Sequence, residues 1–182
     1  MMRYAAIDIE TTGISPDTCQ VLEIGCVIEN EGWSAPVEEL PTFRALVRPD
    51  GVIRGDAQAL AMNHKLLAEL ASKSGVDAHL SGHLIDLGAF IHDHLGDTSI
   101  TIAGKNFGSF DLQFLRRNEF WQPNIRHKHR FIDPAMLWWI PRTDAFLPDL
   151  MTCMGRAGVS CPLHTAVDDC RAVIECVRAF YR

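Results

Sequence analysis

Two carboxylates two residues apart, Asp8 and Glu10, are the first residues whose types and spacing suit chemistry. They lie in and directly after an apolar run, Tyr4–Ile9, that predicts a central β-strand. Side chains two apart on a strand point to the same face, so the two carboxylates must lie together. Like charges repel, and the arrangement is costly unless a cation lies between them. Oxygen ligands of this kind suit hard divalent cations such as Mg²⁺ and Mn²⁺.

A second candidate acid, Asp111, follows another predicted strand. Ser99–Ala103 is a short apolar run, Gly104 ends it, and residues 109–119 have helical composition. We expect Ser109 to cap this helix. Asp111 then lies in the first turn, where the helix dipole favours an anion.

The last predicted helix offers two neighbouring acids, Asp168 and Asp169. Thr165 and Asp168 resemble a capping box, with Asp in place of the usual Glu. Behind them a stripe recurs at helical spacing: Ala166, Cys170, Val173, Ile174, Val177 and Tyr181. Successive residues turn by about 100°, so Asp168 should face water, while Asp169 flanks the stripe and looks towards the sheet. We therefore expect Asp169 to be the ligand and Asp168 only a cap, with His164 beside the same site.

The elements that must position these residues follow from apolar periodicity. Three strands in an antiparallel meander open the chain: Tyr4–Ile9, Val21–Ile28 and Phe43–Val47. After them we predict helices over 56–73 and 77–95, strand Ser99–Ala103, helix 109–119, a short strand Arg130–Asp133, a helix opened by Pro134, helix 147–157 and the final helix. This order predicts a mixed α/β sheet with helices on its faces.

Length and composition are those of one soluble domain. The chain has 182 residues, of which 47% are hydrophobic, enough for one core and few for two. No apolar run approaches the ~18 residues of a membrane span, and the N-terminus does not resemble a signal peptide. The six cysteines form no CxxC pair, which favours free thiols in a reducing compartment. We expect a single domain, residues 1–182, in the cytoplasm and without membrane contact.

The charge distribution leaves two interpretations open. A net charge of −6 argues against broad nucleic-acid binding. However, acids at a metal site would be neutralised by cations, and the stretch from Arg116 to Arg130 holds five Lys/Arg, two His and one acid, Glu119. This stretch is either a solvated loop or a strip that holds phosphates.

Together, these residues resemble the motifs of the proofreading-type 3′→5′ exonuclease superfamily, in its branch with four acids and a histidine (DEDDh). The three motifs read Asp8-Ile9-Glu10-Thr11-Thr12-Gly13, then Asn106-Phe107-Gly108-Ser109-Phe110-Asp111, then His164-Thr165-Ala166-Val167-Asp168-Asp169. Their order and spacing agree with the superfamily over nearly the whole chain. Thr165 does not fit the branch that carries a tyrosine.

The resemblance implies a fold and a reaction. The fold is α/β and ribonuclease-H-like, with a mixed five-stranded sheet of order 3-2-1-4-5, strand 2 antiparallel and helices flanking. Two divalent cations, Mg²⁺ or Mn²⁺, are implied: Asp8 bridges both, Glu10 and Asp169 complete one site, and Asp111 holds the other, partly through water. His164 would be the general base. The implied reaction releases nucleoside 5′-monophosphates from the 3′ ends of single-stranded DNA or RNA.

Several further residues are candidates for holding the terminal nucleotide. Backbone from Thr11, Thr12 and Gly13 would hold the ribose, because a turn there brings backbone close to a ligand. Met62 and Asn63 lie in the stretch that corresponds to the superfamily's nucleotide-contacting loop, with ordinary helix-end residues as the alternative. Phe110 is a further candidate, with a place in the core as its alternative.

The rival hypothesis is a non-catalytic nucleic-acid-binding or interaction domain on the same fold. All five catalytic positions hold the required residue types, which favours the enzyme. The sequence leaves open DNA against RNA, the substrate length, whether the chain serves a polymerase or acts alone, and whether it is a homodimer, as several members of the superfamily are.

Overall fold

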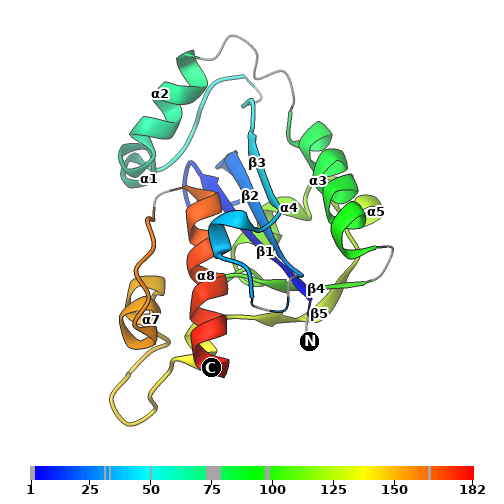
Figure 1. Cartoon of the computed structure of the whole chain (residues 1–182). Helices are drawn as coiled ribbons and strands as arrows, with labels where there is room; N and C mark the ends of the chain where they lie inside the picture. The colour runs from blue at the N-terminus through cyan, green and yellow to red at the C-terminus, as the bar shows by residue number, and fades with distance from the viewer. Residues whose placement is uncertain are drawn as a thin grey trace.

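Five strands form the central sheet, in the order β3-β2-β1-β4-β5 (Figure 1). The strands are β1 (Tyr4–Thr11), β2 (Val21–Glu29), β3 (Thr42–Leu46), β4 (Ile100–Ala103) and β5 (His127–Ile132). β2 pairs antiparallel with both β1 and β3, while β4 and β5 run parallel to β1. The predicted fold class, strand order and antiparallel second strand are confirmed. This computed structural model describes residues 3–30, 32, 34–49, 51–72, 79–96, 99–163 and 165–182.

Helices lie on both faces of the sheet (Figure 1). On one face α8 (Ala166–Tyr181) runs along β1 and β2, with α6 (Pro134–Leu137) and α7 (Leu150–Ala157) packed against it. On the other face are α3 (Leu80–Leu95), α4 (Asp111–Leu115) and α5 (Trp121–Asn124). The remaining elements are α1 (Ala57–Met62), α2 (His64–Ser72) and the short 3₁₀ helix η1 (Val37–Glu39). None of the helices in the described ranges has the length and apolar character to span a bilayer.

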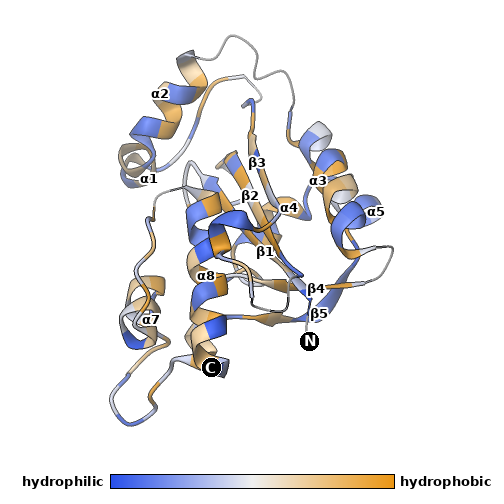
Figure 2. Cartoon of the chain, viewed as in Figure 1, coloured by the Kyte–Doolittle hydropathy of each residue, from blue (hydrophilic) through white to orange (hydrophobic). Residues whose placement is uncertain are grey.

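The alternation of β1 divides the core between the two faces. Ala5, Ile7 and Ile9 are buried in the cluster that includes residues of α3, α4 and α5. Tyr4 and Ala6 are buried in a second cluster with α8 residues. Figure 2 shows β1 and β2 largely hydrophobic and α8 with hydrophobic and hydrophilic stretches in turn. Since Asp8 and Glu10 continue the series of Tyr4 and Ala6, the alternation aims both acids at the α8 side.

Several boundaries differ from the prediction. The helix expected over 56–73 is interrupted at Asn63 and forms α1 and α2, residue 73 lying outside the described residues. The helix expected over 77–95 begins at Leu80, and residues 77 and 78 also lie outside them. β5 begins at His127 rather than Arg130, and α7 begins at Leu150, after the N-cap Asp149. η1 and α5 were not predicted, because each is about one turn long and has no periodicity to detect.

The predicted helix 109–119 was wrong in its start and its cap. The helix comprises only Asp111–Leu115, and its N-cap is Phe110, with no side-chain hydrogen bond. The Ser109 hydroxyl instead donates to the carbonyl of Asn106 at 3.1 Å. Asn106 has a φ of 59°, so the chain turns sharply before the helix and uses Ser109 within that turn.

Candidate metal centre and active site

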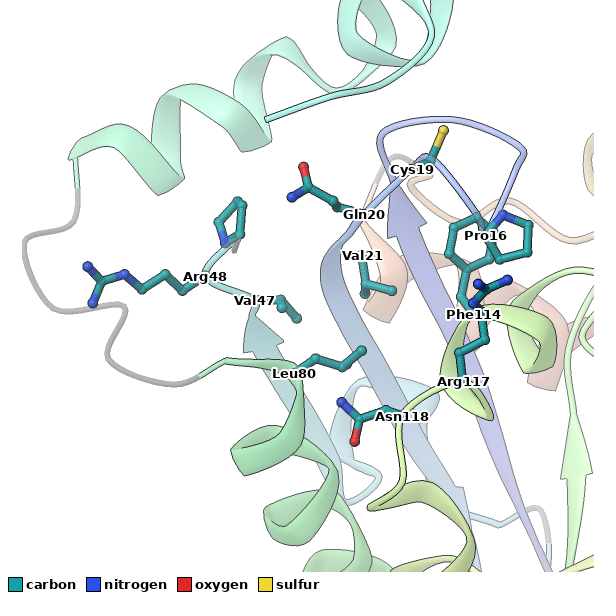
Figure 3. A pocket seen from close by; sticks show the side chains of 11 residues that line it. Pro16, Cys19, Gln20, Val21, Val47, Arg48, Leu80, Phe114, Arg117 and Asn118 are labelled. Carbon is teal, nitrogen blue, oxygen red and sulfur yellow. The ribbon is translucent and has the colours of Figure 1, made fainter. Parts of the chain in front are cut away.

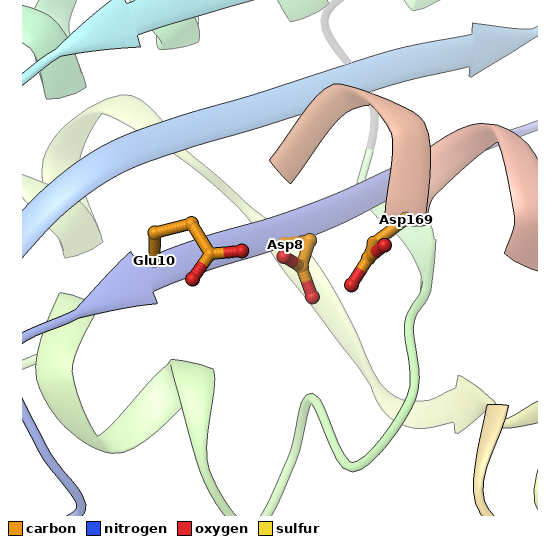
Figure 4. A group of neighbouring side chains, drawn as sticks. All are labelled: Asp8, Glu10 and Asp169. Carbon is orange, nitrogen blue, oxygen red and sulfur yellow. The ribbon is translucent and has the colours of Figure 1, made fainter. Parts of the chain in front are cut away.

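Three predicted acids meet beside the sheet (Figure 4). Asp8 and Glu10 come from β1 and Asp169 from the first turn of α8, and each offers one carboxylate oxygen within 4.8 Å of the others. Asp168 is turned elsewhere: its backbone N–H donates to the Thr165 hydroxyl, which in turn donates to its carboxylate. Asp169, the acid that the apolar stripe of the last helix selected, thus lies with Asp8 and Glu10. Asp168 does not face water as expected, because its side chain is only 22% exposed and lies near Arg171.

Asp111, the first residue of α4, joins the group through a hydrogen bond to the backbone of β1. Its side chain is buried, and Oδ1 accepts the backbone N–H of Ile9 at 3.0 Å. Ile9 stands between the two strand acids, so this bond fixes the Asp111 carboxyl beside both of them. Among neighbouring charges, Asp111 does the most to raise the pKa of Asp8. Four carboxylates from three elements therefore share one site.

The four acids act on one another electrostatically. Burial, then the charges of Asp111, Asp169 and Glu10, raises the pKa of Asp8 well above its usual range. Burial likewise raises the pKa of Glu10 and of Asp111 to about 7 each. Near neutral pH such a group must hold protons or bind cations. The carboxylate oxygens that the described residues offer here fit a hard divalent cation such as Mg²⁺ or Mn²⁺.

The turn after β1 is rigid and buried. Thr11 and Thr12 are buried, and the Thr11 hydroxyl donates to the Gly13 carbonyl at 2.7 Å. The Thr12 hydroxyl accepts from the backbone of Gln20 and donates to the carbonyl of Arg54. A Cβ at Gly13 would lie 2.3 Å from the Asp56 carboxylate, so that side chain would have to shift to admit another residue. The residues expected to hold the ribose thus form a preorganised turn beside the acids.

Asn63 occupies the break between α1 and α2 and contacts the centre directly. Its side-chain amide donates to the Thr11 carbonyl at 3.0 Å. A further side-chain hydrogen bond from Asn63 to Glu10 lowers the pKa of Glu10, against the larger effect of burial. Asn63 therefore orients Glu10 and anchors the α1–α2 segment over the end of β1.

Met62 and Phe110, the other two candidates for contacting the terminal nucleotide, differ in their surroundings. Met62 is 73% exposed at the end of α1, next to Asn63, where a base could reach it. Phe110 is half-buried against the α3-side core, with its ring 5.3 Å from that of Phe114. These contacts favour the core alternative for Phe110. His164 lies outside the described residues, and its role as general base stays a prediction.

Gly25 and Glu23 on β2 were not predicted from the sequence to be part of the site. A side chain at Gly25 would lie 2.4 Å from the backbone of Ala166, so this glycine lets the start of α8 rest directly on the strand opposite Asp8. Glu23 is a fully buried acid that pairs with Glu10 in the antiparallel register. Both had a signal in the sequence, since a glycine or an acid within an apolar strand calls for an explanation.

The basic stretch is partly a strand rather than a loop. Lys128, His129 and Arg130 are exposed on β5, at the edge of the sheet. Residues of α4, α5 and β5 line a cavity of about 530 Å³ whose basic members are Arg116, Arg126, His127 and His129. Gly108, just before Asp111 in the second motif, lies at the same cavity.

A smaller cavity, of about 220 Å³, lies between the turn before β2, the end of β3, α3 and α4 (Figure 3). Pro16, Val21, Leu80 and Phe114 give it apolar walls, and Arg48 and Arg117 line it as well. Arg117 also forms an ion pair with Asp17 at 2.5 Å. None of the four acids lines this cavity, so it is separate from the candidate centre.

Comparison with known proteins identifies solved structures of similar fold. No family model matches the sequence, and no curated protein matches it. Solved structures do. The nuclease domain of 3′hExo, described as a DEDDh family member and bound to rAMP, is 12% identical, with 97% of this chain and 88% of that chain covered and a TM-score of 0.66.

Exonuclease I is similar over a part of its length. The E. coli enzyme in complex with a dT13 oligonucleotide is 12% identical, with 100% of this chain and 41% of that chain covered and a TM-score of 0.65. The enzyme from Methylocaldum szegediense is 14% identical, with 100% and 40% covered and a TM-score of 0.69. The present chain therefore spans about two fifths of these exonuclease I chains. At such identities the likeness shows a shared fold, the ribonuclease-H-like fold of DEDDh nucleases that the motifs implied.

Proposed function

We propose that this chain is a metal-dependent 3′→5′ exonuclease of the DEDDh superfamily, with residues 1–182 as one exonuclease domain. It hydrolyses phosphodiester bonds of single-stranded DNA or RNA and releases nucleoside 5′-monophosphates. The observation that carries the proposal is the convergence of Asp8, Glu10, Asp111 and Asp169 in one group, in which the acids raise one another's pKa values. The shared fold with nucleases described in complex with rAMP and dT13 supports it.

The four acids hold the metal ions in this proposal. Asp8 would help to hold both of two divalent cations, with Glu10 and Asp169 at one of them and Asp111 at the other. Two such cations, Mg²⁺ or Mn²⁺, supply positive charge that stabilises the phosphate as negative charge develops on it. The protein keeps the acids in place through the Ile9 N–H on Asp111 and the Asn63 amide on Glu10.

The remaining chemistry falls to His164 and the turn after β1. A histidine with an ordinary pKa near 6.5 can accept a proton at neutral pH, so we assign His164 as the base that takes the proton of the attacking water. The rigid Thr11–Gly13 turn holds the terminal ribose, and the exposed Met62 contacts the last base. A strand that ends against this turn presents its last phosphate to the acids, which accounts for action at a 3′ end.

The rest of the strand needs a positively charged path, because the chain as a whole is acidic. We assign the path to the basic cavity and the exposed residues of β5. The free thiols of all six cysteines fit a reducing compartment, so the cytoplasm stays part of the proposal.

The decisive test compares two neighbouring acids. Wild-type protein with Mn²⁺ or Mg²⁺ should release mononucleotides from a 5′-labelled single strand and shorten the labelled strand stepwise from its 3′ end, and EDTA should stop the release. Asp8→Ala and Asp169→Asn should each abolish it, whereas Asp168→Asn, one residue away, should retain it. Absence of any release by the wild type on matched DNA, RNA and very short RNA strands would instead favour the non-catalytic alternative.

A further inference from the structure

Glu23 is a fifth carboxylate next to the four acids, yet it has partners of its own. It is fully buried on β2, opposite Glu10, and its charge adds to those that raise the pKa of Asp8 and Glu10. A buried charge in so acidic a place must be compensated by specific contacts. Those contacts show what the residue does.

One oxygen of Glu23 holds the start of α8. Oε2 accepts the backbone N–H of Ala166, the first residue of the helix, at 2.9 Å. The first N–H groups of a helix have no partner within it and carry the positive end of its dipole. The Thr165 hydroxyl accepts a different N–H, that of Asp168, at 3.1 Å. Glu23, on β2, therefore caps the N-terminus of α8 in addition to Thr165.

The same turn of α8 is pressed onto β2 at two more points. The backbone of Ala166 lies against Gly25, and the Cys170 thiol donates to the Gly25 carbonyl at 3.5 Å. Asp169 lies within this turn, between Ala166 and Cys170. Its position relative to Asp8 thus depends on how the turn rests on β2, and Glu23 is the charged anchor.

Arg44 of β3 holds the other oxygen of Glu23. Its Nε donates to Glu23 Oε1, and its two terminal nitrogens donate to both oxygens of Glu69 on α2, at 3.2 and 2.9 Å. Arg44 thus joins the anchor of α8 to the helix that follows Asn63. The α1–α2 segment is tied to the centre twice, through Asn63 on Glu10 and through Glu69 on Arg44.

We propose that Glu23 and Arg44 are positioning residues that hold Asp169 at the metal centre and link that centre to the α1–α2 segment over the terminal nucleotide. The inference rests on the proposed function for its link to turnover, but its effect on metal binding stands independently of turnover. The Arg44 guanidinium matches two carboxylates in one plane, which a lysine cannot reproduce.

The test separates positioning from mere stability. Glu23→Gln keeps the size and an acceptor for Ala166 N–H but loses the charge that Arg44 needs, and Glu39→Gln, at an exposed site, is its control. Isothermal titration of the metal-free proteins with Mn²⁺ should show affinity weakened by about 10–100-fold in Glu23→Gln and unchanged in Glu39→Gln, as for other residues that orient metal ligands. Thermal melts in EDTA show whether each variant is folded.

Arg44 is tested by graded replacement. Arg44→Met should weaken Mn²⁺ binding as Glu23→Gln does, Arg44→Lys should restore part of it, and Glu23→Gln combined with Arg44→Met should cost little more than either alone. Exposed Arg142→Met is the control. Glu69→Gln should raise KM several-fold while leaving kcat and Mn²⁺ affinity near wild type, because it loosens only α2.

Two results would overturn the inference. Folded Glu23→Gln and Arg44→Met proteins with wild-type Mn²⁺ affinity would make the pair purely structural. Abolished binding in Glu23→Gln, to the extent seen for Asp8→Ala, would make Glu23 a ligand rather than a positioning residue. A wild type that binds Mn²⁺ but cleaves no strand would refute the proposed function alone, and the Mn²⁺ titrations would still decide this inference.

Discussion

Charged side chains are arranged differently at the two ends of the contact between α8 and β2. At the far end, Arg178 of α8 forms an ion pair with Glu29 at 2.7 Å, with both side chains almost wholly buried. Arg178 also donates to the Ala35 carbonyl at 2.7 Å. At the near end, Asp8, Glu10, Asp111 and Asp169 converge, and the charges that reach them are mainly each other's. The far end holds an acid paired with a base, whereas the near end gathers four acids, which in the proposed function bind cations.

This difference predicts that removing charge has opposite effects at the two ends. Arg178→Met leaves Glu29 buried without its cation and should lower the free energy of unfolding by about 3–5 kcal/mol. Urea unfolding of the metal-free protein measures the loss. The double variant Arg178→Met/Glu29→Leu should recover most of it, and an equal loss in the double variant would mean that packing, rather than charge, holds this end.

At the near end, Asp8→Asn should stabilise the metal-free protein while it removes activity. The amide relieves repulsion with the other acids, and the expected gain is about 0.5–2 kcal/mol. Urea unfolding in EDTA measures it. Wild type should gain stability when Mn²⁺ is added, and Asp8→Asn should gain little. A less stable Asp8→Asn in EDTA would show that the acids are already compensated.

The pH dependence of stability should differ in the same way. Glu10 and Asp111 keep protons in the folded chain up to about pH 7, but release them at their ordinary, lower pKa values when unfolded. The folded state then holds more protons between those values, so metal-free stability should fall as pH rises from about 4.5 towards 7. Melting temperatures in EDTA across this range should show the fall, and saturating Mn²⁺ should remove it. A rise with pH in EDTA would contradict the raised pKa values.

The smallest expected effect lies on the basic surface. Arg126→Ala or Lys128→Ala should weaken binding of a long single strand a few-fold and reduce the salt dependence by roughly one phosphate contact each. Fluorescence anisotropy with the inactive Asp8→Ala protein measures both. Arg142→Ala, in an exposed loop, should leave the salt slope unchanged. If the salt dependence of binding were the same in all three variants, the nucleic acid would bind at another surface.

Much of the fold could be read from local patterns. The meander followed from three apolar runs with turn residues between them, and Thr165 caps α8 as the motif predicted. Prediction failed where the elements are about one turn long or where a sharp turn competes with a helix. Ser109 lies in the turn at Asn106 instead of capping a helix, the helix predicted over 109–119 is only the short α4, and α5 was not predicted.

The sequence by itself determined that Asp8 and Glu10 share one face of a strand, because side chains two apart on a strand point the same way, and helical periodicity selected Asp169 on the last helix. Only the tertiary structure decided how they meet. The bond from Ile9 N–H to Asp111, the hold of Asn63 on Glu10 and the anchoring of α8 by Glu23 and Gly25 join residues far apart in sequence. Periodicity is a property of one element, whereas distances between elements arise from packing. A sequence can thus identify the candidate acids, but the packing of α8 on β2 brings them together in one site.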